Sequence, residues 1–168
     1  MNHDVPLLRR LARPRLARSL IALTVLLAAS GAAFAGECAK RVPDGQGQKP
    51  GPSAPVGVSD SVRATTDLSK EPAAIAGRSF RLRQLDVAPG GIVPWHSHEN
   101  RPAMIYIVSG EIYEYSSSCA EPILHKAGDV APEKKGTSHW WKNTSTAPAV
   151  LISVDLFPVD MKMDPHQM

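Results

Sequence analysis

The chain has 168 residues, with 19 Lys and Arg against 16 Asp and Glu, so its formal net charge at pH 7 is +3. Residues 1–35 carry five Arg and one Asp, which leaves 14 basic and 15 acidic side chains in residues 36–168, a net charge of −1. This near-neutral balance excludes nucleic-acid binding driven by net charge. A chain of this length is expected to form one folded domain.

Residues 1–35 have the pattern of a secretory signal peptide. Five arginines between Arg9 and Arg18 precede an apolar run at 20–29, and Ala33-Phe34-Ala35 supplies a cleavage signature of small residues. The apolar run is about half of the roughly 20 residues that a membrane span needs. We therefore expect cleavage before Gly36, a periplasmic or secreted protein, and no membrane association after cleavage.

The two cysteines, Cys38 and Cys119, would lie in an oxidising compartment. A disulfide between them would close a long loop. Two free buried thiols are the alternative, and the sequence leaves both open.

Residues 36–57 are rich in Pro and Gly and contain few apolar side chains, which predicts a mobile linker or an arm lying across the domain. We expect the folded domain to span residues 58–160. Residues 161–168 form a flexible tail with three Met and one His, a composition that could bind copper(I), although frayed termini are the usual reading.

Only the segment from Ser69 to Gly77 resembles a helix, with Ser69 as the cap of a single turn. The remainder has strand character, with short segments between turn residues. The expected strands are 80–88, a histidine strand that follows a turn at Pro89-Gly90-Gly91, 104–108, 111–115, 122–126, 137–142 and 149–157. Seven or eight short strands predict an all-β jelly-roll sandwich or small barrel.

His96 and His98 follow the glycine turn and are separated by one residue. In an extended strand, residues two apart point to the same side, so both imidazoles can reach one metal ion. A His-x-His pair alone is more often two surface histidines, so a metal site needs further ligands from elsewhere. His125 is expected to be an ordinary surface or core histidine.

The spacing of glycines and histidines resembles the two motifs of the cupin family. The first motif is glycine, five residues, His-x-His, three or four residues, Glu, six residues and glycine, and it is matched by Gly90, His96, His98 and Gly110. The second is glycine, five residues, Pro-x-Gly, two residues, His, three residues and Asn, and it is matched by Gly128, Gly136, His139 and Asn143. The resemblance covers Phe80 to Phe157 and implies a double-stranded β-helix barrel.

The chain departs from these motifs at two positions. Ala103 stands where the family has its metal-binding Glu, and Lys134 replaces the turn proline of the second motif. The resemblance then implies a site of three histidines, His96, His98 and His139, like that of the three-histidine iron dioxygenases of the superfamily. Glu99 is a candidate fourth ligand, although strand alternation points it to the opposite face.

Three imidazoles form one face of a divalent ion and leave positions open for water, substrate or dioxygen. Iron or manganese is favoured, and zinc, nickel or copper would also accept these ligands. Arg101 and Ala103 are candidates for the substrate side of the site, with Trp141 as a pocket wall. Arg81 and Arg83 are read as a solvated sheet face in preference to a barrel mouth. Trp95 and Trp140 fall on the opposite face and are candidates for a homodimer contact.

Two functions remain open from the sequence. The first is a periplasmic metal-dependent oxygenase or isomerase that acts on a small anionic or oxygen-rich substrate. The second is a non-catalytic module that binds or senses a metal or a small ligand. The fold alone cannot choose between them, because one fold hosts many functions.

Overall fold

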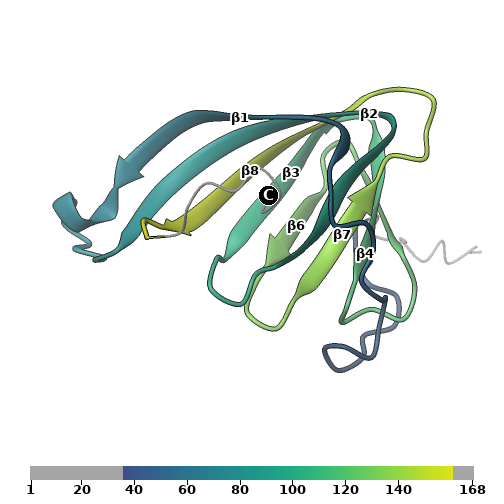
Figure 1. The fold of residues 1–168 in the computed structure, drawn as a ribbon, viewed down its shortest axis with the longest axis horizontal. Helices are drawn as coiled ribbons and strands as arrows, with labels where there is room; N and C mark the ends of the chain where they lie inside the picture. The colour runs from purple at the N-terminus through teal and green to yellow at the C-terminus, as the bar shows by residue number, and fades with distance from the viewer. Residues whose placement is uncertain (1–35, 161–168) are drawn as a thin grey trace, which may run out of the picture. The chain divides into compact units, whose positions relative to one another are not determined.

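A computed structural model describes residues 36–160, and β-strands make up nearly all of its regular structure (Figure 1). The predicted signal peptide and the Met-containing tail lie outside the described residues. The eight strands are β1 (Val56–Asp67), β2 (Arg78–Ser97), β3 (Ala103–Ser109), β4 (Glu111–Ser116), β5 (Ile123–Lys126), β6 (Val130–Glu133), β7 (Ser138–Lys142) and β8 (Ala149–Pro158). The all-β prediction is confirmed, and β1 and β6 are strands that the sequence pattern did not reveal.

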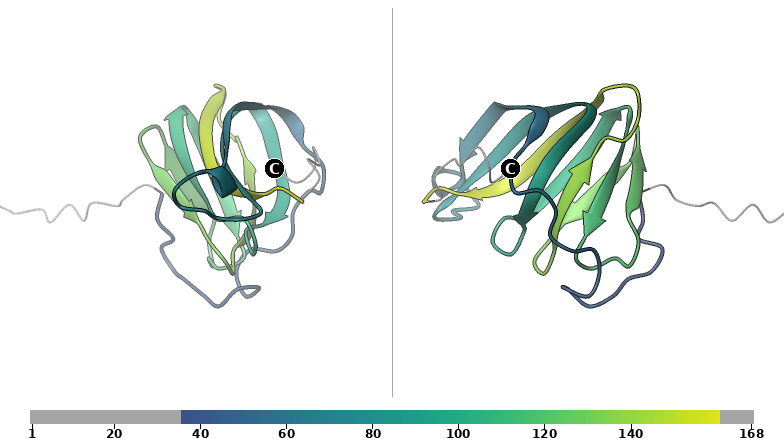
Figure 2. Two further views of the ribbon diagram at one scale, coloured as in Figure 1. Left: turned by 90° about the vertical axis from the view of Figure 1, so that its left-hand side faces the viewer. Right: turned by 45° about the vertical axis from the view of Figure 1, so that its right-hand side comes forward.

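All strand pairs are antiparallel and join in one eight-stranded sheet, which bends along β2 into two parts, named the larger and the smaller sheet (Figures 1 and 2). Its residues 78–87 pair with β8, and its residues 92–97 pair with β7. The larger sheet therefore contains β1, the first part of β2, β8, β3 and β6, and the smaller sheet contains the last part of β2, β7, β4 and β5. This arrangement is the predicted double-stranded β-helix.

The prediction that Pro89-Gly90-Gly91 forms a turn between two strands is wrong. The single strand β2, which is 20 residues long, runs through these three residues. Gly90 has a φ of +75°, and a Cβ atom at Gly91 would lie 2.7 Å from the carbonyl oxygen of Ala88. Two glycines thus let the strand bend from one sheet into the other without ending.

The space between the sheets is filled by every second residue of the strands. On β8 buried and half-buried residues alternate from Ala149 to Leu156, as a strand with one covered face requires. The buried apolar cluster contains Leu85, Val87, Val93, Ile105, Ile107, Ile112, Trp141 and Leu151. Burial of these side chains is the main stabilising contribution to the barrel.

The helical turn is shorter than the predicted segment from Ser69 to Gly77 and begins one residue earlier. A 3₁₀-helix spans Leu68–Lys70, and Asp67 caps it by accepting hydrogen bonds from the backbone N–H and the hydroxyl of Ser69. Ser69 is therefore inside the turn and is not its cap. Among residues 36–160, no helix is long and apolar enough to cross a membrane.

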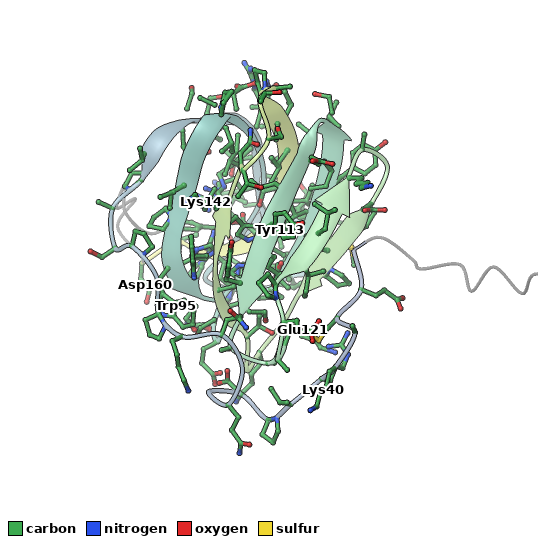
Figure 3. The ribbon with its side chains drawn as sticks, turned by 90° about the vertical axis from the view of Figure 1, so that its right-hand side faces the viewer. Lys40, Trp95, Tyr113, Glu121, Lys142 and Asp160 are labelled. Atoms are coloured by element: carbon green, nitrogen blue, oxygen red, sulfur yellow. A yellow bond between two sulfur atoms is a disulfide. The ribbon has the colours of Figure 1, made fainter. Side chains whose placement is uncertain are left out.

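Residues 36–55 lie against the barrel as an arm. The backbone N–H of Val42 donates to Ser118 O at 3.0 Å, and that of Gly47 donates to Ser117 O at 2.8 Å. A disulfide joins Cys38 to Cys119, which are 81 positions apart in the sequence. In Figure 3 Lys40 of this arm lies close to Glu121 of the β4–β5 loop, and Tyr113 and Lys142 mark the outer face of the smaller sheet.

Candidate metal centre

His96, His98 and His139 meet at one point inside the barrel. His96 on β2 lies directly opposite His139 on β7, and His98 follows the last residue of β2. Their Nε2 atoms are 3.0 Å apart for His96 and His98, 3.0 Å for His98 and His139, and 3.1 Å for His96 and His139. The structure therefore brings together the three histidines that the motifs singled out.

The other ring nitrogen of each histidine faces an oxygen that can only accept a hydrogen bond. The Nδ1 atom of His96 lies 2.8 Å from the carbonyl oxygen of Pro94, and that of His98 lies 2.7 Å from the carbonyl oxygen of Arg101. His139 Nδ1 lies 2.9 Å from Oε1 of Glu114. Each Nδ1 must therefore carry the hydrogen, so all three Nε2 atoms present lone pairs to one another.

The spacing of the three Nε2 atoms fits a divalent ion. Nitrogens about 2.1 Å from one ion and separated by 90° would be about 3.0 Å apart, whereas tetrahedral angles would separate them by about 3.4 Å. The observed 3.0–3.1 Å corresponds to one face of an octahedron. The residues present thus fit a metal ion with several positions left for other ligands.

The electrostatics of the trio also favour a cation. Burial, followed by the neighbouring imidazoles, lowers the pKa of His96 well below its usual value, and burial lowers the pKa of His98 to about 3. Both rings are therefore neutral at physiological pH. Lone pairs that converge from the three rings repel one another, and a bound cation would remove this repulsion.

The structure does not bring Glu99 to the trio. Its carboxylate lies 3.1 Å from Nζ of Lys135 and accepts a hydrogen bond from the backbone N–H of Gly136 at 3.3 Å. The side chain is 58% exposed, as strand alternation indicated. Glu99 is thus a surface residue near the turn at Gly136.

Arg101 and Ala103 are both buried. The Nη1 atom of Arg101 donates to Oδ2 of Asp155 at 3.0 Å, while its carbonyl oxygen holds His98. Ala103 packs in the apolar cluster between β6 and β8. Arg101 is thus held in a buried ion pair, and its contact with a substrate stays a prediction.

A small cavity lies in front of the three histidines. Its volume is about 20 Å³, which is enough for one water-sized ligand. Trp141 forms part of its wall, as expected, and its Nε1 lies 3.5 Å from Nε2 of His139. The other lining residues are Arg83, Leu85, Val93, Ile105, Leu151 and Ser153.

Arg83 is the cation that faces this cavity, and reading it with Arg81 as a solvated face was wrong. Both arginines are 5% exposed. Arg81 donates to both carboxylate oxygens of Asp155, and Arg83 pairs with Asp60 of β1. The Nε atom of Arg83 is buried and has no hydrogen-bond partner. Strand β1, which the sequence did not reveal, pairs with the edge of β2 and supplies Asp60 as the partner of Arg83.

Two buried carboxylates behind His139 were missed by sequence reasoning. Glu114 Oε2 accepts from His125 Nε2 at 2.9 Å, and Glu133 Oε2 lies 3.5 Å from His139 Nδ1. Burial opposes ionisation of Glu114, but the hydrogen bonds from His125 and His139 prevail and lower its pKa to about 2. Burial and the charge of Glu114 raise the pKa of Glu133 well above its usual range.

These carboxylates line a second cavity of about 90 Å³, which the arm covers with Gly36, Cys38 and Arg41. His125 is therefore a core residue, one of the two expected alternatives. The alternation of β4, in which Glu114 lies between the inward-facing Ile112 and Ser116, was the signal that could have revealed the carboxylate.

The remaining motif residues have structural roles. Gly90, Gly110, Gly128 and Gly136 all have positive φ values. At Gly110 a Cβ atom would lie 2.5 Å from the carbonyl oxygen of Pro148, so the turn between β3 and β4 requires glycine. Asn143 is fully buried and donates to the carbonyl oxygens of Val87 and Ala147. Trp140 stacks on Tyr115 with ring centroids 4.0 Å apart.

Comparison with known proteins agrees with this fold and site. A family model described as the cupin domain matches residues 83–155. Nectarin-1 of Nicotiana langsdorffii x Nicotiana sanderae is 33% identical over 75 residues, which are 43% of this chain and 33% of that protein. Germin-like protein subfamily 2 member 2 of Arabidopsis thaliana is 31% identical over 78 residues, which are 45% of this chain and 36% of that protein. The chain thus spans about a third of the length of these curated relatives.

Among solved structures, a predicted oxalate decarboxylase from Thermotoga maritima has a TM-score of 0.50 and 21% identity, over 66% of this chain and 92% of that one. At this identity the likeness concerns the fold alone. The match to the family model covers the strands that carry all three histidines. Residues 83–155 therefore match the cupin domain, with a candidate metal site at the centre of the barrel.

Proposed function

We propose that the protein is a metal-dependent cupin in which His96, His98 and His139 hold a divalent ion, iron or manganese by preference. The observation that carries the proposal is the convergence of three Nε2 lone pairs at 3.0–3.1 Å. A divalent ion would supply Lewis acidity there and, in the case of iron, a site for dioxygen. The reaction class that suits such a site is oxygenation or isomerisation of a small molecule.

The cavity favours a small anionic substrate. Arg83 lines the cavity, and its guanidinium, whose Nε lies 3.9 Å from Oδ2 of Asp155, places a positive charge beside the space where a carboxylate would bind. Leu85, Val93 and Trp141 exclude water from the same space, which strengthens electrostatic interactions within it. Arg83 takes the role that the sequence suggested for Arg101.

A periplasmic or secreted location fits the same proposal. The disulfide between Cys38 and Cys119 requires an oxidising compartment in most organisms. By the chain-entropy model, closing a loop of 81 residues contributes about 4 kcal/mol to stability. The disulfide also holds the arm over the second cavity, on the far side of His139 from the proposed ion.

Metal content tests the proposal directly. We expect the purified full chain to hold about one equivalent of a divalent metal and the His96→Ala, His139→Ala double variant to lose nearly all of it, because a single remaining imidazole binds weakly. His166→Ala, in the tail, is the matched control and should retain the metal. Equal metal content in the wild type and the double variant would refute the site.

A non-catalytic binding module is the second candidate, and the small size of the cavity, about 20 Å³, favours it. The two functions are distinguished by oxygen consumption and product analysis of the metal-loaded protein with catechols, diketones, thiols, flavonols and small carboxylates. Turnover of any of these, absent in the double variant, supports the enzyme. Bound metal without turnover supports the binding module.

We also propose that the protein forms a homodimer through the outer face of the larger sheet. Apolar side chains lie side by side there in two registered rows: Leu82, Val154, Met104 and Pro132, and Ile152, Tyr106 and Val130. Met104 is 62% exposed and Tyr106 45% exposed. A face without charge at its centre can pack against its own copy about a two-fold axis.

Tyr106→Glu places two negative charges at that two-fold contact, so sedimentation analysis should show a dimer for the wild type and a monomer for the variant. Tyr113→Glu, on the outer face of the smaller sheet (Figure 3), is the control and should remain a dimer. A monomeric wild type would end this proposal without affecting the metal site.

A further inference from the structure

A line of buried polar side chains crosses the inner face of the smaller sheet behind His139. Its members are His125 on β5, Glu114 on β4 and His139 on β7, and none is more than 5% exposed. His125 is paired in register with Ile112, and His139 with Ser116, the two neighbours of Glu114 on that face. Glu114 is thus the diagonal neighbour of both histidines, within reach of a long side chain.

Both carboxylate oxygens of Glu114 are used in this line. Oε1 accepts a hydrogen bond from Nδ1 of His139 at 2.9 Å, and Oε2 accepts one from Nε2 of His125 at 2.9 Å. The ring of His125 packs against Trp141, with ring centroids 4.7 Å apart. The carboxylate is therefore fixed by His125 on one side and directed at His139 on the other.

Glu133 does not share this role. Its Oε2 lies 3.5 Å from the same Nδ1 atom of His139, whose single hydrogen Glu114 already accepts. A separation of 3.5 Å is outside the usual range of an N–H···O hydrogen bond. Glu114 is therefore the acceptor that sets the orientation of the His139 ring.

The nature of the acceptor distinguishes His139 from the other two histidines. The Nδ1 atoms of His96 and His98 face backbone carbonyl oxygens, which are uncharged, whereas that of His139 faces a carboxylate. A hydrogen bond to a charged acceptor is stronger than one to a neutral acceptor, and it draws the Nδ1 hydrogen away from the ring. The Nε2 atom of that ring then becomes the more basic ligand.

We propose that Glu114, held by His125, is the positioning residue of His139, which it fixes in orientation and makes the strongest electron donor of the three imidazoles. The inference rests on the proposed function, because it concerns a ligand of the same ion. Imidazole ligands bring no negative charge to a divalent ion. Glu114 supplies one negative charge directly behind a ligand, so it stabilises the more highly charged states of the metal.

Glu114→Gln tests the role of the charge while it keeps the shape of the side chain. The amide oxygen of Gln can accept the hydrogen bond from His139. Its NH₂ group can donate to Nε2 of His125, because the unpartnered Nδ1 atom of that ring can carry the hydrogen instead. The orientation of His139 is then retained, and only the negative charge behind it is lost.

Cobalt(II) and iron report this loss. We expect the cobalt affinity of Glu114→Gln to fall by about 10- to 100-fold relative to the wild type, and the visible cobalt bands to shift. The reduction potential of the iron-loaded variant should rise, because loss of a negative charge favours the ferrous ion. A carboxylate that only filled space would leave all three quantities unchanged. Glu111→Gln, on the opposite face of β4, is the matched control and should behave as the wild type.

Nuclear magnetic resonance addresses the same point without a variant. In the zinc-loaded wild type, the ring N–H proton of His139 should resonate further downfield than those of His96 and His98, because its acceptor is charged. This measurement keeps the inference testable if Glu114→Gln does not fold, which circular dichroism would show.

Wild-type cobalt bands and iron potential in a folded Glu114→Gln would overturn the inference and leave the three-histidine site intact. A ring proton of His139 that is no further downfield than the other two would do the same. A wild type that binds neither cobalt nor zinc would instead refute the proposed function, and the inference with it.

Discussion

The two sheets contribute opposite kinds of groups to the interior. The smaller sheet and the residue after β2 supply three neutral imidazoles, each fixed by an oxygen acceptor on its Nδ1. The larger sheet supplies Arg81, Arg83 and Asp155, a buried cluster held by charge. The first group suits a bound cation, and the second leaves a guanidinium facing the same cavity. The barrel thus holds a candidate metal site and a buried guanidinium around one cavity.

The difference also concerns how each region is stabilised. The rings of His96 and His98 have lowered pKa values and lose little when they are desolvated, whereas each arginine of the cluster depends on a carboxylate partner. Breaking a buried ion pair leaves an uncompensated charge, which costs more than loss of the pair as a whole. The larger sheet should therefore be the more sensitive of the two to single charge changes.

The largest expected effect follows from Asp155→Asn. Asp155 is 1% exposed and is shared by Arg81 and Arg101, so its loss should lower the free energy of unfolding by about 3–5 kcal/mol. Urea denaturation measures this change. Asp160→Asn, at an exposed turn, should remain within about 0.5 kcal/mol of the wild type. Equal stability of the two variants would show that the cluster does not support the fold.

The same carboxylate makes stability depend on pH. Burial opposes ionisation of Asp155, but the hydrogen bonds and charges of Arg81, then the charges of Arg83 and Arg101, lower its pKa below its usual value. A lowered pKa in the folded state means that the stabilisation is complete above the unfolded value of about 4 and is lost as the pH falls through the folded value. Between pH 5 and pH 2 the free energy of unfolding should thus decline less steeply in Asp155→Asn than in the wild type.

A smaller effect is expected from Arg83→Met. Charge-assisted hydrogen bonds contribute about 1.5–3 kcal/mol, so the affinity of the metal-loaded protein for formate should fall by about 10- to 100-fold. Calorimetric titration with formate measures it. Arg63→Met is the matched control, because Arg63 is exposed and bonds Gln84 on the outside of β1. Unchanged formate affinity in Arg83→Met would remove Arg83 from the substrate side, while the histidines would still bind the metal.

Much of the barrel and its histidine trio could be predicted because the relevant signals are local. Gly90, Gly110 and Gly128 mark the corners through their positive φ values, and His96 and His98 share a face through strand alternation. His139 could be predicted only from the motif spacing, because it pairs with His96, which is 43 positions away in the sequence.

The charged groups could not be predicted in the same way. Polar residues that alternate along a strand give the same sequence pattern whether their side chains face water or a buried partner. The partners of Arg81 and Arg83 come from β8 and β1, which are distant in the sequence. Glu114 and Glu133 were missed for the same reason, because their burial depends on the arm and on the closure of the barrel. The bend of β2 was also hidden, because a Pro-Gly-Gly run indicates a turn just as well as it permits a bend.

The sequence by itself determined the β-class, the corners of the barrel and the identity of the three imidazoles, because these depend on backbone preferences and on fixed spacing along the chain. Only the tertiary structure decided which charges face inward and which groups they pair with, because burial and pairing depend on the surfaces that strands present to one another. Arg81 and Arg83 show the division: the sequence placed both on one face of a strand, and the pairing of β2 with β8 and β1 buried that face and supplied Asp155 and Asp60 as partners.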